Sequence, residues 1–181
     1  MGAPGELAGP DGLTLRPWRP GDAPVVLRAF SPLEMARQAG RPVTTTTEAL
    51  EWVAEREGER AAGTAYAWAV VGDGVPLGHV SVAAVNHVHG IGWVSYWTAE
   101  GARRKGVALG GVRVLARWAF DDLGLHRLEL GHRTNNPASC AVAVRAGFRP
   151  EGVDREKLRY GGVRYDVERH ARLATDHVND G

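Results

Sequence analysis

The sequence predicts a mixed α/β (α+β) domain in which helices cover both faces of a mixed sheet. Alternating apolar residues mark strands along the chain, apolar residues at three- and four-residue spacing mark helices between them, and one long helix separates two strands. Strands separated by a helix pair in parallel, whereas strands joined by tight turns pair antiparallel. The sheet is therefore expected to contain both arrangements.

The first half of the chain is expected to form a strand, two helices and a three-stranded meander. Leu13–Arg16 alternates like a strand. Asp22 is expected to cap a helix that carries a proline in its first turn and runs to Phe30. Thr45–Glu48 contains a capping box for a helix that runs toward Arg60. The meander strands are expected at 66–71, 77–85 and 91–98, with a Gly-Asp-Gly turn between the first two.

The second half begins with the strongest helical pattern. Apolar residues recur at three- and four-residue spacing from Val107 to Leu123, and Gly124 is expected to close this helix. The strand before it, at 91–98, and the strand after it, at 127–131, should form a right-handed parallel crossover. A second helix is expected at 136–146, followed by a hairpin at 148–158 and 164–173.

Length and charge limit the classes of protein. The 181 residues suit one domain at 12–173, with a disordered extension at 1–11 and a frayed tail at 174–181. The formal net charge is only +1, and no aromatic–basic stripe is present, so neither nucleic acid nor an anionic membrane is an expected partner. Any anion must therefore bind to a local cluster of charge.

Cysteine content and the N-terminal sequence point to an intracellular protein. Cys140 is the single cysteine, which excludes an internal disulfide framework and a cysteine-based metal cluster, and no metal is expected. The N-terminus lacks the basic and apolar regions of a secretory signal, and no window approaches the roughly 20 apolar residues of a membrane span. A cytoplasmic location is expected.

The segment between the third meander strand and the long helix has the features of a diphosphate site. Arg103, Arg104 and Lys105 supply positive charge, Gly106 permits close backbone approach, and the small Ala108 keeps the first helical turn open. The spacing matches neither a Walker loop nor a dinucleotide fingerprint. By itself, this loop fits a solvated basic turn equally well.

Six motifs in order and spacing extend the evidence beyond the loop. They are Tyr96-Trp97-Thr98, Arg103-x-x-Gly106-x-Ala108, Trp118-Ala119-Phe120, Leu123–Leu128, Asn136-Pro137-Ala138-Ser139 and Ala146–Gly152. As a set they resemble the GNAT N-acetyltransferases, and within them the RimJ/RimL-like ribosomal-protein alanine/serine N-acetyltransferases, over about residues 13–173. Each motif is weakly specific alone.

The resemblance implies a mostly antiparallel sheet with a splayed parallel pair, and acetyl-CoA or another short acyl-CoA as co-substrate. The pyrophosphate would bind backbone N–H groups of residues 103–108, which include Val107, and the pantetheine would lie along Tyr96, Trp97 and Thr98. A homodimer is possible in such a family. Arg104 stands where many relatives carry glycine, so its side chain either crowds the diphosphate or reaches the 3′-phosphate of CoA.

Acyl transfer to an amine needs a polarised thioester carbonyl and a proton for the departing thiolate. A backbone N–H near Trp97 or Thr98 is the natural oxyanion donor. Asn136 and Ser139 match the family's Asn-x-x-Ser, so Ser139 could protonate the sulfur and Asn136 could bind pantetheine or substrate. Both residues are also preferred at helix starts, which leaves a capping role open. Other relatives use a tyrosine where this chain has Ala143.

The general base is not evident from the sequence. Trp93 and Leu158 occupy positions where relatives carry glutamate. His79 and Asp166 are the main candidates, although His79 could simply be packed and Asp166 could hold the hairpin; further candidates are His87, His89 and Glu156. A free α-amine, with a pKa of about 7.7–8.0, needs little help from a base. Trp93 and His79 are expected to line an acceptor pocket that is more apolar than in relatives.

The leading function is an acyl-CoA-dependent N-acyltransferase, transferring acetyl to a primary amine of a protein N-terminus or a small molecule by direct attack in a ternary complex. One alternative keeps the enzyme but transfers another acyl group, such as succinyl. A second alternative, from a different class, is a non-catalytic acyl-CoA sensor, which the missing carboxylates favour. Turnover of acetyl-CoA with an amine would separate the sensor from the enzyme.

Overall fold

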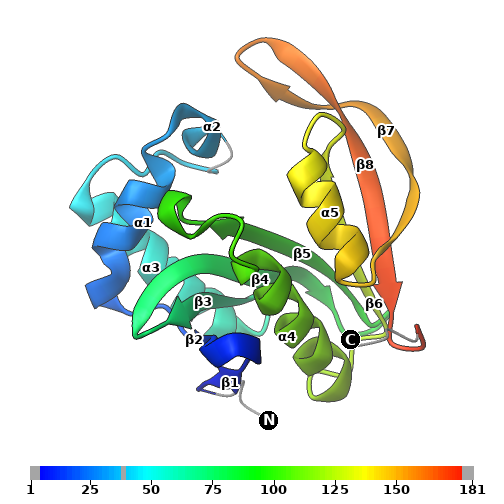
Figure 1. Cartoon of the computed structure of the whole chain (residues 1–181), viewed down its shortest axis with the longest axis horizontal. Helices are drawn as coiled ribbons and strands as arrows, with labels where there is room; N and C mark the ends of the chain where they lie inside the picture. The colour runs from blue at the N-terminus through cyan, green and yellow to red at the C-terminus, as the bar shows by residue number, and fades with distance from the viewer. Residues whose placement is uncertain (1–4, 38–39, 177–181) are drawn as a thin grey trace.

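The computed structural model describes residues 5–37 and 40–176 and contains one mixed eight-stranded sheet with the strand order β1-β2-β3-β4-β5-β6-β8-β7. Figure 1 shows this sheet with the helices packed against it. Neighbouring strands are antiparallel except for β5 and β6, which pair in parallel across helix α4. The predicted fold class, a mostly antiparallel mixed sheet with one parallel pair, is confirmed.

The strands have the following bounds: β1 Leu7–Ala8, β2 Thr14–Arg16, β3 Tyr66–Gly72, β4 Val75–Asn86, β5 Ile91–Thr98, β6 Arg127–Arg133, β7 Arg149–Tyr160 and β8 Val163–Leu173. The α-helices have the following bounds: α1 Ala23–Phe30, α2 Leu33–Ala36, α3 Thr46–Ala62, α4 Val107–Asp121 and α5 Pro137–Arg145. Within the described ranges, no helix is long and apolar enough to cross a membrane.

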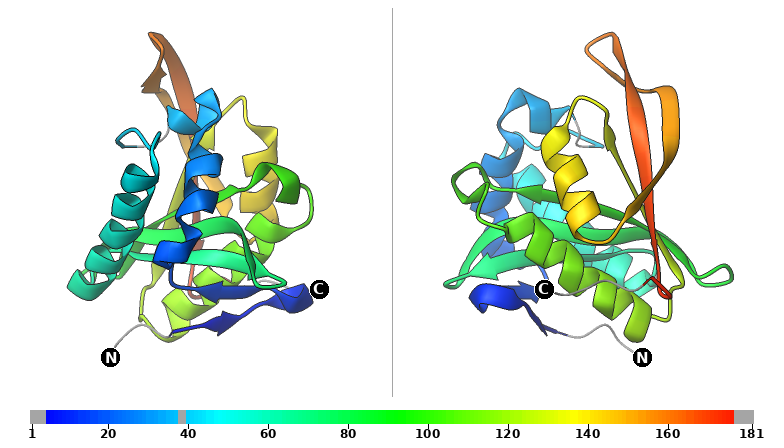
Figure 2. Two further views of the ribbon diagram at one scale, coloured as in Figure 1. Left: turned by 90° about the vertical axis from the view of Figure 1, so that its left-hand side faces the viewer. Right: turned by 45° about the vertical axis from the view of Figure 1, so that its right-hand side comes forward.

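Two apolar cores form because the sheet has helices on both faces (Figure 2). One core joins α4 and α5 to the sheet and includes the fully buried Leu115, Leu128 and Phe148. The other joins α1 and α3 to the opposite face and includes Val26 and Trp52. The alternation of β6, in which Leu128, Leu130 and His132 are buried, sends every second side chain of that strand into the first core.

Local signals fixed most element boundaries. Thr45 caps α3 through the predicted capping box, since its side chain accepts from the Glu48 N–H and the Glu48 carboxylate accepts from the Thr45 N–H. Strand β5 matches its predicted bounds, whereas β6 continues two residues past the expected end at Gly131. Those two residues pair with β8, and that pairing depends on distant sequence.

Both chain ends carry more structure than expected. Leu7 and Ala8 form an antiparallel pair with β2, so the prediction of disorder is wrong for residues 5–11, while residues 1–4 lie outside the described part. At the other end, the Ala174 N–H donates to the His126 carbonyl, and Asp176 pairs with Arg149. The expected fraying therefore does not apply to 174–176, and 177–181 lie outside the described part.

Asp22 has a different role from the predicted helix cap. Its side chain makes no cap bond to α1. Instead, its two carboxylate oxygens accept from the Arg16 guanidinium at 2.7 and 2.9 Å, and one also accepts from the Arg19 N–H at 2.9 Å. Both partners of this ion pair are about 9% exposed, so it ties β2 to the start of α1 inside the protein.

Candidate functional site

The two parallel strands diverge soon after they begin. The β5–β6 ladder consists of three Cα pairs and ends at Trp93 opposite Glu129. Beyond this point β5 stays paired with β4 as far as Thr98, and β6 stays paired with β8 as far as Arg133 (Figure 1). Residues 94–98 therefore present to β6 a strand edge that lacks a ladder partner among the described residues. Such an edge offers backbone N–H and C=O groups to an extended ligand.

Helix α5 is tied to the diverging edge. The Tyr96 hydroxyl donates to the Ser139 carbonyl at 3.1 Å, and burial raises the pKa of Tyr96, which keeps this donor protonated. Asn136 is the N-cap of α5, and its Oδ1 accepts from the Ser139 N–H at 3.1 Å. Asn136 thus acts as the helix cap that the sequence allowed, and Ser139 lies in the first turn, next to β5.

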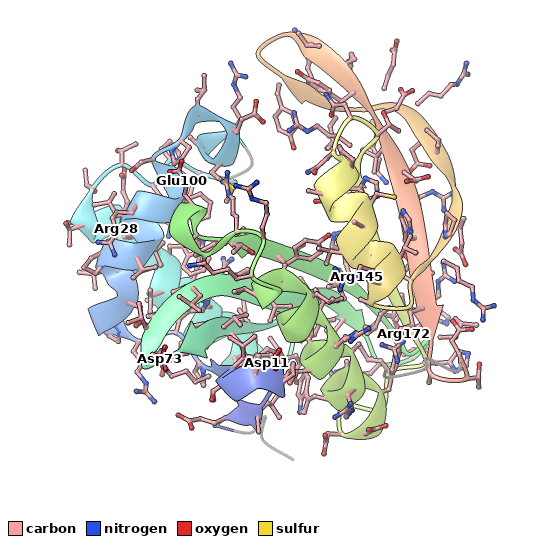
Figure 3. The ribbon with its side chains drawn as sticks, in the orientation of Figure 1. Asp11, Arg28, Asp73, Glu100, Arg145 and Arg172 are labelled. Atoms are coloured by element: carbon pink, nitrogen blue, oxygen red, sulfur yellow. The ribbon has the colours of Figure 1, made fainter. Side chains whose placement is uncertain are left out.

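The loop between β5 and α4 opens with a short 3-10 turn, Glu100–Ala102, and Figure 3 labels Glu100. Arg103, Arg104 and Lys105 follow it and are exposed. Gly106 is the N-cap of α4, with φ of 77° and no side-chain cap. A Cβ built at Gly106 would meet nothing within 4 Å, so the backbone here is open to a bulky ligand.

The first turn of α4 is the predicted anion site. Val107 is buried against the sheet, and the small Ala108 is half-buried in the first turn. The first N–H groups of a helix have no intrahelical partner and carry the positive end of its dipole. With three exposed basic residues just before it, this turn is suited to bind a diphosphate.

His79 lies in an aromatic cluster on the opposite face. It is 5% exposed, and its ring stacks on Trp97 at 5.6 Å between centroids. The Trp18 indole N–H donates to His79 Nδ1 at 3.1 Å, so the proton of the neutral ring lies on Nε2 and no lone pair is left for a substrate. Burial and the nearby Arg56 charge lower the pKa of His79 to about 3. This geometry favours packing over general-base catalysis.

Asp166 and Trp93 both contact strands next to their own. Asp166 Oδ1 accepts from the Glu156 N–H at 2.8 Å, at a bulge where Glu156 has φ of 54°, so Asp166 stabilises the β7–β8 hairpin. Trp93 lies beside Gly131 of β6, where an added Cβ would come within 3.1 Å of the indole, and the Lys157 ammonium lies 5.6 Å from the ring centroid. Trp93 therefore sits where the two strands begin to separate.

Comparison with known families decides the family of the chain. A family model described as an acetyltransferase (GNAT) domain matches residues 12–149. The chain belongs to the GNAT family. The splayed parallel pair, the open start of α4 and the Asn136–Ser139 cap are therefore features of a GNAT domain in this chain.

Individual GNAT relatives agree with this assignment. The Bacillus subtilis protein YdaF, a candidate ribosomal N-acetyltransferase, is 31% identical over 101 residues, which cover 56% of this chain and 55% of YdaF. The chain thus matches about half the length of the curated relatives. Mycobacterium smegmatis RimJ in complex with a CoA disulfide superposes with a TM-score of 0.83 at 26% identity, covering 94% of this chain and 86% of RimJ. RimL in complex with coenzyme A shares the fold, with a TM-score of 0.85 at 22% identity over 93% and 97% of the two chains.

Hydrogen bonds bring together only some of the residues that the sequence predicts for the GNAT site. Tyr96 and Ser139 touch, and Asn136 holds Ser139. His79 and Asp166 make their polar contacts elsewhere. Ala143, at the position of the family tyrosine, is fully buried in the core. A cluster that joins β6, β8 and α5 was not predicted from the sequence, because strand register and the packing of α5 together bring its members into contact.

Arg104 provides a test of the GNAT loop. Its φ of 62° is the left-handed conformation, which glycine adopts without strain, and its side chain is exposed. If the Arg104 guanidinium contacts the 3′-phosphate, we expect Arg104→Gly to weaken CoA binding about tenfold while dephospho-CoA binding stays unchanged, because that charged contact would be lost. Calorimetric titration with both ligands measures this, and an equal loss for the two would rule out the 3′-phosphate contact.

Proposed function

We propose that this GNAT protein is an acyl-CoA-dependent N-acyltransferase that transfers acetyl from acetyl-CoA to a primary amine. The observation that carries the proposal is the unpaired edge of β5 at residues 94–98, which is followed along the chain by the uncapped start of α4. An extended arm bearing amides fits the first, and a pyrophosphate fits the second. CoA has both groups in one molecule.

Each part of the donor has residues suited to hold it. The N–H groups at the start of α4, after Gly106, bind the pyrophosphate, and the charges of Arg103 and Lys105 add attraction. The edge from Tyr96 to Thr98 binds the pantetheine amides. A backbone N–H near Trp97 or Thr98 then stabilises the oxyanion that forms when the amine attacks the thioester carbonyl.

The leaving group needs a proton, and we infer that Ser139 provides it. Asn136 and Tyr96 fix the first turn of α5 through the Ser139 N–H and carbonyl, so neither bond uses the Ser139 hydroxyl. The hydroxyl is thus available to donate to the CoA sulfur as the C–S bond breaks. Its proton is replaced from solvent, or from the ammonium formed by attack.

For the acceptor we infer an α-amine of a protein N-terminus, or a small amine of similarly low basicity. The support is the environment of the candidate bases: His79 is packed, and Asp166 holds a bulge. An α-amine with a pKa near 7.7–8.0 is partly neutral at pH 7.5 without a base, whereas lysine at about 10.4 is not. The description of RimL as a ribosomal L7/L12 alpha-N-protein acetyltransferase agrees with such an acceptor. Trp93 gives the acceptor side an aromatic wall.

Turnover distinguishes the enzyme from an acyl-CoA sensor. Purified protein is mixed with acetyl-CoA or succinyl-CoA and a panel of amines, and free thiol is measured over time, with amine-free reactions as the control. The panel contains N-terminal peptides beginning with Ala or Ser, aromatic amines and Nα-blocked lysine. We expect amine-dependent thiol release with α-amines and acetyl-CoA, and little with lysine. Tight CoA binding without release on any amine would assign the protein as a sensor.

A further inference from the structure

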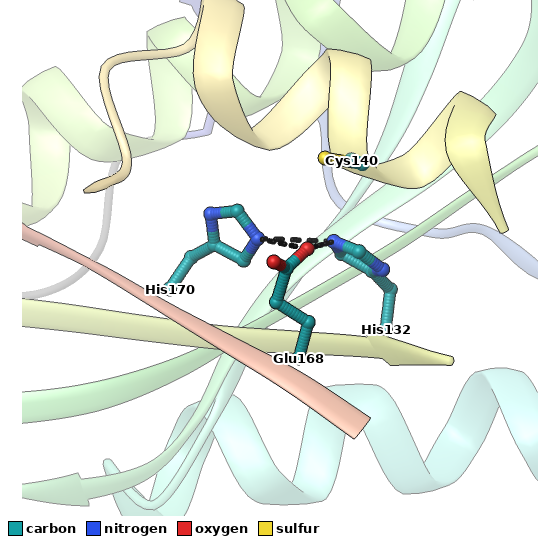
Figure 4. A group of neighbouring side chains, drawn as sticks. All are labelled: His132, Cys140, Glu168 and His170. Atoms are coloured by element: carbon teal, nitrogen blue, oxygen red, sulfur yellow. Dashed lines mark hydrogen bonds and ion pairs between the residues drawn. The ribbon is translucent and has the colours of Figure 1, made fainter. Parts of the chain in front are cut away.

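Four potential metal ligands converge beneath the first turn of α5. His132 lies on β6 directly opposite Glu168 of β8, and His170 follows two residues later on the same face of β8. Cys140 of α5 approaches from above (Figure 4). One ligand atom from each residue lies within 4.8 Å of the other three. The histidines are 7% and 2% exposed, while Cys140 and Glu168 are half-buried.

The ligand atoms at the centre of this cluster carry more lone pairs than protons. His132 Nδ1 lies 3.0 Å from the Arg133 carbonyl, which can only accept, so Nδ1 carries the proton and Nε2 of the neutral ring presents a lone pair. His170 Nε2 lies 3.0 Å from His132 Nε2 and 3.2 Å from Glu168 Oε2. A neutral His170 has at most one proton there for two acceptors. A cation at the centre would satisfy all of these groups at once.

The spacing suits zinc. Tetrahedral Zn²⁺ with Zn–N and Zn–O near 2.0–2.2 Å and Zn–S near 2.3 Å places neighbouring ligand atoms about 3.3–3.6 Å apart. Here His132 Nε2, His170 Nε2 and Glu168 Oε2 form a triangle with sides of 3.0, 3.2 and 3.3 Å. A shift of a few tenths of an ångström opens this triangle around the metal, and the Cys140 sulfur, within 4.8 Å of the other ligand atoms, would move inward by up to about 1 Å to close the fourth position.

The chemistry of the donors also selects this ion. Two imidazoles, one thiol and one carboxylate suit Zn²⁺ and not Mg²⁺ or Ca²⁺, which prefer oxygen. The bond from His132 Nδ1 to a backbone carbonyl is the outer contact that metal-binding histidines usually make, since it fixes the ring and its tautomer. Four protein ligands leave no open coordination position, which is typical of a structural site.

We propose that His132, Cys140, Glu168 and His170 bind one structural Zn²⁺ that fastens α5 to β6 and β8. Binding converts the Cys140 thiol to a zinc thiolate and releases its proton. Cys140 directly follows Ser139, and Tyr96 holds the same turn from the β5 side. The ion would therefore hold the first turn of α5 from the β6 side. This turn would then connect the two diverging strands, β5 and β6. This proposal does not depend on acyl transfer.

Metal titration tests the site directly. The full chain is stripped with a chelator, dialysed and titrated with Co²⁺ and then with Zn²⁺. We expect one ion per chain, a thiolate-to-cobalt charge-transfer band, visible bands of tetrahedral Co²⁺, and displacement of both by Zn²⁺. Cys140→Ser should abolish the charge-transfer band, and Cys140→Ser and His170→Gln should each weaken Zn²⁺ binding at least about 100-fold. His126→Gln, an exposed histidine outside the cluster, is the matched control and should bind Zn²⁺ normally.

Melting temperatures distinguish a variant that has lost the metal site from a variant that does not fold. Zn²⁺ should raise the melting temperature of the stripped wild type and of His126→Gln, because it binds only the folded protein tightly, and should leave Cys140→Ser unchanged. Cys140 lies on a half-buried helix position, so Cys140→Ser carries the test if His170→Gln fails to fold. Absence of a charge-transfer band in wild type, or equal Zn²⁺ affinity in wild type and Cys140→Ser, would overturn the proposal and leave a hydrogen-bonded cluster only.

Discussion

Replacing Ser139 with alanine is expected to lower kcat by about 100-fold or more while the Kd for CoA changes little, because general-acid catalysis contributes roughly 10²–10⁴-fold. The substitution removes only the hydroxyl. The Ser139 N–H still donates to Asn136 Oδ1, and its carbonyl still accepts from Tyr96, so the first turn of α5 keeps both anchors. Single-turnover thiol release gives the rate of the chemical step, and calorimetry gives the Kd.

The matched control is Ser31→Ala. Ser31 is an exposed serine at the C-cap of α1, and it lies outside the proposed donor site. We expect kcat and Kd of this variant to equal those of the wild type. If Ser139→Ala retains full kcat, proton donation by Ser139 is excluded, and water becomes the donor. If the affinity for CoA falls by the same factor as kcat, Ser139 contributes to CoA binding and not to proton transfer.

Replacing Asp22 with asparagine is expected to reduce the free energy of unfolding by about 3–5 kcal/mol, because it leaves the buried Arg16 charge without its counter-ion. The pair is about 9% exposed on both sides, and Arg16 makes two bonds to the Asp22 carboxylate. Urea unfolding at pH 7 measures the loss. The matched control is Glu51→Gln, whose ion pair with Arg41 has side chains 53% and 40% exposed, and such a surface pair contributes less than about 1 kcal/mol.

Acid should remove the difference between wild type and Asp22→Asn. Burial pushes the pKa of Asp22 up, but the hydrogen bonds from Arg16 and from the Arg19 N–H outweigh this, so the pKa in the folded protein lies below its usual value. The stabilisation is therefore present above the unfolded pKa of about 3.9 and is lost as the pH falls through the folded pKa. A difference that stays constant down to pH 2 would show that the charge of Asp22 is not its source.

Local pattern predicted the elements well because each depends on residues close in sequence. The β5 strand follows from alternation, and the α3 start follows from the Thr45 and Glu48 side chains, which are three residues apart in the capping box. Prediction was poorer where an element needs a distant partner. The β1 strand has only two residues and exists because Leu7 and Ala8 pair with β2.

The roles predicted for single residues also failed where a distant partner decided the contact. Asp22 precedes a helix, and sequence alone made a cap the natural expectation. Arg16 lies close enough in the fold to take both carboxylate oxygens, and a buried cation needs its counter-ion more than a helix start needs a cap. His79 looked like a base beside the site, yet the indole of Trp18, 61 residues away, occupies its lone pair.

The sequence by itself determined the family, the mixed sheet and the position of the α4 start, because these depend on periodicity and on motifs within one or two turns of chain. Tertiary structure alone decided which side chains meet. The β6–β8 register sets His132 opposite Glu168, and the packing of α5 against these strands brings Cys140 to them. No spacing along the chain encodes that contact, because a one-residue slip between two strands would turn these side chains to opposite faces.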